Sequence, residues 1–132
     1  MGDRDNITVS GNQNSNINIK NVNSMLTNAH EAVDAMADKG QAEREDLQAL
    51  ITQLQQALES IPGNLKDEAE AVAASAQMLV ENAKAQTPNK PLLQISGEGL
   101  KKAAEGLAGV APTLVNIATQ IVTAVMRMKG MA

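Results

Sequence analysis

The 132-residue chain contains no cysteine, phenylalanine, tyrosine or tryptophan. Without cysteine it has no disulfide framework, no thiolate nucleophile and no cysteine-ligated metal, and a reducing compartment is the expected location. Without aromatic rings it lacks the platforms on which single-strand nucleic-acid binders stack bases. A folded core must therefore be filled by leucine, isoleucine, valine, methionine and alanine.

Positive charge and long apolar runs are also scarce. Eleven lysines and arginines against fifteen acids give a net charge of −4, which disfavours general affinity for nucleic acid or anionic lipid. No stretch approaches the roughly 18 uninterrupted apolar residues of a spanning helix, and the N-terminus lacks the regions of a secretory signal. Polar side chains interrupt the mostly apolar residues 111–128, which favours a buried bundle helix over a membrane-active segment. We therefore expect a cytoplasmic protein that binds neither nucleic acid nor a membrane.

The chain does contain a short repeat near its start. Residues 6–10, Asn-Ile-Thr-Val-Ser, are echoed by residues 16–20, Asn-Ile-Asn-Ile-Lys, with small polar and turn-forming residues between them. Both copies alternate polar and apolar side chains, a pattern typical of half-buried strands. The few large apolar residues of this region cannot form a core of their own, and an isolated two-stranded unit is marginal in water. The strands must therefore dock on the helices or stack on the same strands of other copies.

Stacking between copies is the interpretation that we favour over an intramolecular hairpin or a disordered tail. Two rungs per chain advance by roughly 9.5 Å, which is close to the separation of packed helices, so attached helices fit beside such a stack. Asparagine side chains in register form ladders of cross-β type, and β-branched side chains fill a dry interior. The predicted self-assembly residues are Asn6, Ile7, Val9, Asn16, Ile17, Asn18 and Ile19.

Helical periodicity begins at about Ser24, with Asn23 or Ser24 as the predicted first N-cap. Apolar stripes cover residues 26–37, 47–61, 65–83, 100–107 and 114–125, and proline and glycine mark breaks between the later ones. The break at residues 39–40 is weak, so the first two stripes either separate there or continue as one rod. Residues 96–99 either begin a helix or interrupt one. Short connections favour antiparallel neighbours and hence a bundle.

No constellation of residues predicts a reaction. His30 is the only histidine and has no catalytic or metal-ligating partner at a suitable spacing, so we predict a solvated or interface histidine. Residues 3–6 lack the spacing of a calcium loop, and residues 97–99, Gly-Glu-Gly, lack the Gly-Lys-Ser/Thr of a phosphate loop. We therefore expect no catalytic residue, no bound cofactor and no metal site.

Residues 3–22 also carry a resemblance. Their Asp-Asn-Ile-Thr-Val-Ser-Gly-Asn start and Asn-Ile-Asn-Ile echo resemble N-terminal segments of bacterial proteins tied to signalling NTPases and effector domains. They are also similar in style to two-rung amyloid signalling motifs. The resemblance implies homotypic assembly and nucleation of partners with matching repeats, and it carries over no catalytic residues.

The predicted fold class is mainly α, with four to five helices in a bundle or helical hairpin array and a short N-terminal two-strand β repeat that stacks between chains. Residues 1–23 form the predicted assembly segment and residues 24–132 the helical domain. The predicted function is that of a non-enzymatic structural protein forming a homopolymeric filament, with a cross-β, solenoid-like spine and the helices outside. The alternative is a bacterial signalling adaptor or effector, whose repeat recruits a protein with a matching repeat and whose helical domain acts on a membrane or on another protein.

Overall fold

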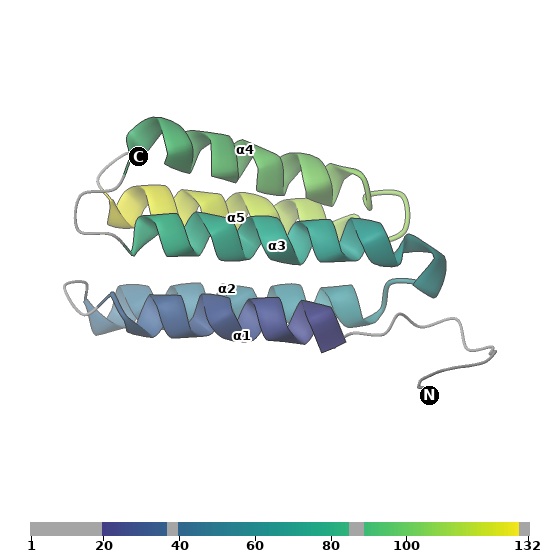
Figure 1. Cartoon of the computed structure of the whole chain (residues 1–132), viewed down its shortest axis with the longest axis horizontal. Helices are drawn as coiled ribbons and strands as arrows, with labels where there is room; N and C mark the ends of the chain where they lie inside the picture. The colour runs from purple at the N-terminus through teal and green to yellow at the C-terminus, as the bar shows by residue number, and fades with distance from the viewer. Residues whose placement is uncertain (1–19, 37–39, 85–88, 130–132) are drawn as a thin grey trace.

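The computed structural model describes residues 20–36, 40–84 and 89–129, which form five α-helices and one 3₁₀ turn. The elements are α1 (Lys20–Asp34), α2 (Gln41–Glu59), η2 (Gly63–Leu65), α3 (Lys66–Ala83), α4 (Lys90–Glu105) and α5 (Thr113–Met128). Consecutive helices run in opposite directions along one long axis (Figure 1). The helical bundle predicted for this part of the chain is therefore observed.

The five helices close a ring. α1 contacts α2 and α3, α2 also contacts α5, and α4 contacts α3 and α5, while α3 and α5 touch across the ring. In Figure 1, α4 lies at the upper edge of the bundle, and α1 and α3 lie nearer the viewer than α2 and α5. Because α4 packs on two neighbours at the edge of the bundle, the rest of its surface faces outward.

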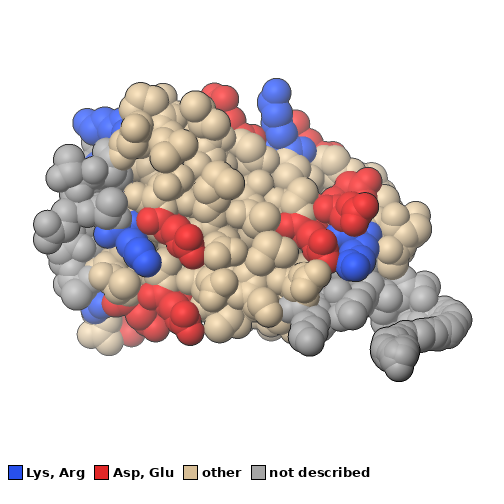
Figure 2. Space-filling view, in the orientation of Figure 1, with Lys and Arg blue, Asp and Glu red and all other residues tan. Residues whose placement is uncertain are grey.

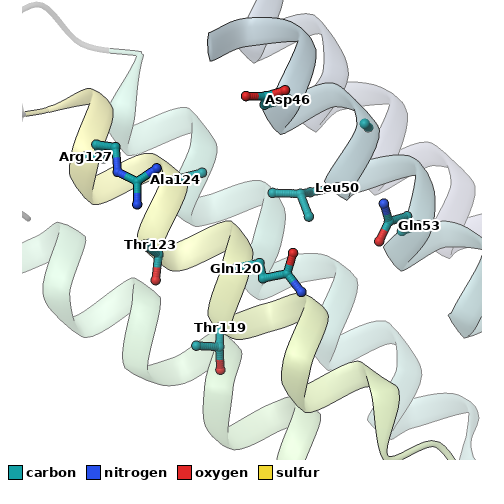
Figure 3. A pocket seen from close by; sticks show the side chains of 9 residues that line it. Asp46, Leu50, Gln53, Thr119, Gln120, Thr123, Ala124 and Arg127 are labelled. Atoms are coloured by element: carbon teal, nitrogen blue, oxygen red, sulfur yellow. The ribbon is translucent and has the colours of Figure 1, made fainter. Parts of the chain in front are cut away.

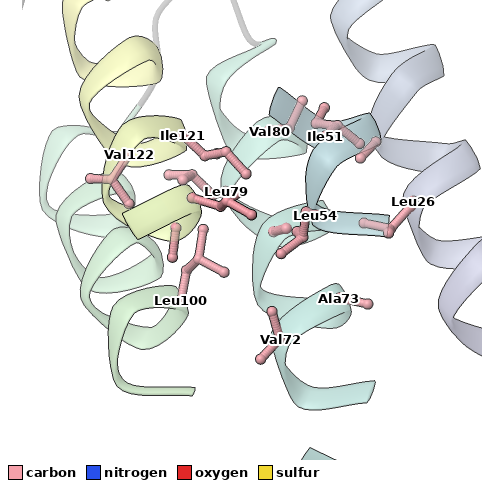
Figure 4. Packing of buried hydrophobic residues seen from close by; sticks show 14 of the residues in the cluster. Leu26, Ile51, Leu54, Val72, Ala73, Leu79, Val80, Leu100, Ile121 and Val122 are labelled. Atoms are coloured by element: carbon pink, nitrogen blue, oxygen red, sulfur yellow. The ribbon is translucent and has the colours of Figure 1, made fainter. Parts of the chain in front are cut away.

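The core is aliphatic and draws on every helix. Buried residues recur three or four positions apart because an α-helix repeats every 3.6 residues. Figure 4 shows side chains of all five helices meeting in the interior, and its labelled members are Leu26, Ile51, Leu54, Val72, Ala73, Leu79, Val80, Leu100, Ile121 and Val122. In place of aromatic rings, leucine, isoleucine, valine and alanine side chains therefore fill most of the core.

Polar groups define the starts of two helices. Gly40 precedes α2, and its backbone N–H donates a hydrogen bond of 3.3 Å to Glu43 Oε1. Asn89 precedes α4, and its Oδ1 accepts a hydrogen bond of 3.0 Å from the backbone N–H of Leu92. Pro91 lies in the first turn of α4, where its missing N–H costs no helical hydrogen bond. These caps fix where each helix begins and therefore which residues face the core.

The predicted β component of the fold class is wrong, because the described residues contain five helices and no strand. The part of the predicted β segment that the structure describes, residues 20–23, is the first turn of α1. Val22 is fully buried and lies four residues before Leu26, also fully buried, so it continues the helical stripe of α1. The cross-β and solenoid architecture thus has no support in the described residues, and the rest of the repeat, up to residue 19, lies outside them.

Two local expectations are also corrected, and one alternative that the sequence left open is decided. α1 begins at Lys20, upstream of the predicted N-cap at Asn23 or Ser24, and so crosses the predicted domain boundary. α1 and α2 contact each other as a hairpin, so they are not one rod, because each has an apolar stripe that packing together removes from water. Residues 96–99 lie inside the continuous helix α4, where Ser96 and Gly97 are buried.

Candidate functional site

The predicted self-assembly residues all lie outside the part of the chain that the structure describes. They are Asn6, Ile7, Val9, Asn16, Ile17, Asn18 and Ile19. Their role in assembly stays a prediction. The candidate sites below belong to the described helices, and the sequence singled out only His30 and the glycines at residues 97 and 99 among their residues.

The single histidine joins α1 to α2. His30 is half-buried, and its Nδ1 forms a hydrogen bond with Gln48 Oε1. Gln48 Nε2 donates hydrogen bonds to Asp34 Oδ1 at 2.8 Å and to the carbonyl oxygen of His30 at 3.3 Å. The imidazole is therefore held in a helix–helix contact, which is one of the two positions predicted for it.

A polar pocket of about 210 Å³ lies next to this network, lined by Asp34, Gln41, Arg44, Glu45 and Gln48. Arg44 Nε is buried there without a hydrogen-bond partner. The pocket mixes one cation with two acids and so defines no single ligand chemistry. Within residues 20–36, 40–84 and 89–129, no group of three or more histidine, aspartate or glutamate side chains is placed to hold a metal ion.

The outer face of α4 carries apolar side chains. The helix buries Leu93 and Leu100 against the bundle, but Leu92 is 40% exposed and Ile95 is 66% exposed. Gly99 follows Ile95 by one turn and is exposed as well. We refer to Leu92, Ile95 and Gly99 as the α4 ridge.

α3 extends this apolar surface alongside the α4 ridge. Asn82 Nδ2 of α3 donates a hydrogen bond of 3.1 Å to Ser96 Oγ of α4, which fixes how the two antiparallel helices are aligned. Met78 is 53% exposed and lies one turn before Asn82, on the same side of α3. The alignment therefore places Met78 level with Leu100, the residue after Gly99. Figure 2 shows uncharged surface over the first half of α4 and over the middle of α3, with charged residues toward both ends.

Two glycines of α4 have different surroundings. A Cβ atom added to Gly97 would lie 3.1 Å from Val122 Cγ1 and 3.4 Å from Met126 Cε, so α5 packs directly on this backbone. A Cβ atom added to Gly99 would meet nothing within 4 Å. Packing within the chain explains the first glycine, whereas no contact within the described bundle explains the second.

A groove of about 440 Å³ separates the outer faces of α2 and α5. Its aliphatic lining residues are Ala49, Leu50 and Ala124. Its uncharged polar lining residues are Gln53, Thr119, Gln120 and Thr123, and its charged ones are Asp46 and Arg127. Figure 3 shows Leu50 of α2 pointing toward α5, with Asp46 and Arg127 on opposite walls toward one end. We refer to this feature as the α2/α5 groove.

The α2/α5 groove is built by residues far apart in the sequence. α2 supplies residues 46–53, and α5 supplies residues 119–127. Leu50 and Ala124 are partly buried against the core, whereas Ala49, Gln53 and Thr123 are exposed. The groove therefore has an apolar floor and a polar rim with one acid and one base, so it offers room for an apolar side chain and charged groups beside it.

Comparisons of the chain with protein-family models, with curated proteins and with solved structures gave no match. Among the helices that the structure describes, none combines the length and the apolar character needed to cross a bilayer.

Proposed function

We propose that this chain is a non-enzymatic structural protein whose copies associate with one another, through the α4 ridge and Met78, into a homo-oligomer or filament. The observation that carries the proposal is the exposure of Ile95, at 66%, between two other exposed apolar side chains. A cytoplasmic location belongs to the proposal on the sequence argument that the chain has no cysteine.

Burial of these side chains between copies supplies a driving force. Full burial of one isoleucine, leucine or methionine side chain is worth about 1.5–3 kcal/mol relative to exposure. Three such side chains lie on one surface here, with the exposed Gly99 between them and the exposed charges Glu98 and Lys102 beside Ile95.

Gly99 supports the same interpretation. A glycine inside a helix costs about 0.8–1.0 kcal/mol relative to alanine, and α3 and α5 leave open space around this one. The missing side chain allows the backbone of another molecule to approach α4 closely. Gly99 thus weakens the isolated helix, but it lies at a position where the absence of a side chain would allow two copies to pack closely.

The proposal keeps the self-assembly predicted from the sequence and assigns it to the described helices. It does not depend on residues 1–19, which stay a separate predicted contribution. In the adaptor alternative, the chain would remain a monomer until a partner with a matching repeat was present. The oligomeric state of the purified chain distinguishes these two functions.

The test is the mass distribution of the full-length chain over a range of concentrations, measured by sedimentation velocity and electron microscopy. We expect concentration-dependent association of the unmodified chain and its loss in Ile95→Lys. The matched control is Val110→Lys, because Val110 is 51% exposed but lies in the connection between α4 and α5. A monomer at every concentration would reject the proposed function and favour the adaptor.

A further inference from the structure

We propose that the α4 ridge of one copy binds in the α2/α5 groove of the next copy, so that the chains associate head to tail. The inference rests on the proposed function and identifies the surface that receives the ridge. It depends on three properties of the two surfaces, namely their shape, their charges and their separate positions on the bundle.

The shapes of the two surfaces are complementary. The α4 ridge lies on an edge helix and presents Ile95, the most exposed of the large apolar side chains in the described residues. The α2/α5 groove has a volume of about 440 Å³ and a floor that includes Leu50 and Ala124. Sites of about 300–1,000 Å³ take small molecules, so the groove has room for the side chains of Ile95 and Leu92.

The charges beside each surface are also complementary. Glu98 and Lys102 are exposed and lie one turn apart on α4, next to Ile95. Asp46 and Arg127 are exposed on opposite walls of the groove, toward one end of it. No ion pair within the described residues involves any of these four side chains. With Ile95 in the groove, Lys102 is able to meet Asp46 of the next copy, and Glu98 is able to meet Arg127.

The two surfaces belong to different helices, so one copy can use both at once. The ridge is on α4, whereas the groove lies between α2 and α5. A contact between two different surfaces is heterologous, and repetition of it gives a closed ring or an open filament. An α4–α4 contact would instead be isologous and would stop at a dimer. The geometry thus links the groove to the polymeric form of the proposed function.

The test uses two full-length variants, each of which lacks one surface. Ile95→Lys alters the ridge and leaves the groove intact, whereas Ala49→Trp fills the groove and leaves the ridge intact. Ala49 is exposed, so its replacement adds bulk outside the core. We expect each variant alone to need about tenfold or higher concentration to associate. We expect a mixture of the two to form 1:1 heterodimers and nothing larger, measured by native mass spectrometry, which separates the variants by mass.

Three outcomes are decisive. A monomeric unmodified chain would reject the proposed function and the groove contact with it. If the unmodified chain assembles and Ile95→Lys does not, but Ala49→Trp assembles normally, the groove contact is rejected and the proposed function stands. Heterodimers in the mixture support the head-to-tail contact, because an α4–α4 contact would let Ala49→Trp pair with itself and would not recruit Ile95→Lys.

A charge exchange provides a second test if Ala49→Trp fails to fold, as judged by far-UV circular dichroism. Glu98→Lys and Arg127→Glu should each weaken assembly, because each places like charges across the contact. The double variant should restore assembly to within about threefold of the unmodified chain. Assembly of Arg127→Glu at the unmodified level would overturn the groove contact, since an α4–α4 contact does not include this residue.

Discussion

The seam between α3 and α4 and the seam between α2 and α5 both join antiparallel helices, yet they differ at the surface. The α3/α4 seam is bridged by the hydrogen bond from Asn82 to Ser96 and presents the exposed side chains of Met78 and Leu92. The α2/α5 seam opens into a groove of about 440 Å³. The same bundle therefore has an apolar surface that projects, the α4 ridge, and a hollow one, the α2/α5 groove.

The buried residues of the helices also differ between the two seams. α2 buries only large aliphatic residues, Leu47, Ile51, Leu54 and Leu58, whereas α3 buries four alanines, Ala69, Ala73, Ala76 and Ala83, beside its valines and leucine. The distance between packed helices depends on the side chains at the contact. We expect the longer buried side chains of α2 to hold its axis farther from α5 than the alanines of α3 hold α3 from α4, which would leave space for the groove.

The largest effect should come from shortening a fully buried side chain of α2. Leu54 is fully buried, so Leu54→Ala should lower the free energy of unfolding by about 2–5 kcal/mol through lost burial and a cavity. The measurement is urea unfolding followed by far-UV circular dichroism. Gln53→Ala, at the exposed neighbouring position, should stay within about 0.5 kcal/mol. A similar loss in both variants would show that the buried face of α2 contributes no more to stability than its exposed face.

A smaller loss should follow from enlarging a small residue in α3. Ala76 is fully buried, and Ala76→Leu should destabilise the chain by about 1–3 kcal/mol because the new side chain overpacks the core. Ala49→Leu adds the same three carbon atoms in the α2/α5 groove, where Ala49 is exposed, and should change stability by less than about 0.5 kcal/mol. Equal losses would remove the distinction between a tightly packed α3 and an open groove.

The helical part of the fold could be predicted because its apolar stripes are long and periodic. The stripes at residues 47–61, 65–83 and 114–125 correspond to α2, α3 and α5. The start of α1 could not be predicted, because Asn21 and Asn23 continue the Asn-rich composition of the preceding repeat, and only the burial of Val22 four residues before Leu26 shows its helical phase. The burial of Val22 in the core, and not the local sequence pattern, therefore decides that this segment is helical.

The candidate surfaces could not be predicted from the sequence. Residues 92–95, Leu-Leu-Gln-Ile, contain three large apolar side chains, and the sequence does not show that Leu93 faces the core while Ile95 faces outward. That choice depends on how α3 and α5 pack on α4. The α2/α5 groove joins Leu50 to Ala124, and no local pattern reports a contact across so many residues. The sequence did contain one sign of an unusual helix surface, the pair of glycines in α4. From the sequence alone, these glycines indicated only that a helix begins or is interrupted at residues 96–99.

A moderate effect should come from the hydrogen bond that bridges the α3/α4 seam. Ser96→Ala removes the acceptor of the Asn82 bond and should lower the free energy of unfolding by about 0.5–1.5 kcal/mol. Thr123→Ala is the control in the α2/α5 seam, where the side chain is exposed. A double-mutant cycle with Asn82→Ala isolates the coupling of the pair. Absence of coupling would mean that side-chain packing alone aligns α3 with α4.

The smallest stability effect should also have the opposite sign. Gly99→Ala should raise the free energy of unfolding by about 0.5–1 kcal/mol, because alanine favours the helix and the added Cβ meets nothing within 4 Å. Gly97→Ala makes the same change two residues earlier, where the Cβ would lie 3.1 Å from Val122 Cγ1, and it should gain nothing or lose stability. Urea unfolding at a concentration where the chain is monomeric provides the comparison.

Gly99→Ala should at the same time weaken association between copies, because the added methyl group separates α4 from the partner surface. A more stable monomer with weaker assembly is the combination that distinguishes an interface glycine from one that merely weakens a helix. If Gly99→Ala stabilises the monomer and leaves the sedimentation profile unchanged, the close approach at α4 is wrong. The contact would then have to rest on Ile95, Leu92 and Met78 alone, and the open space beside Gly99 would have no part in it.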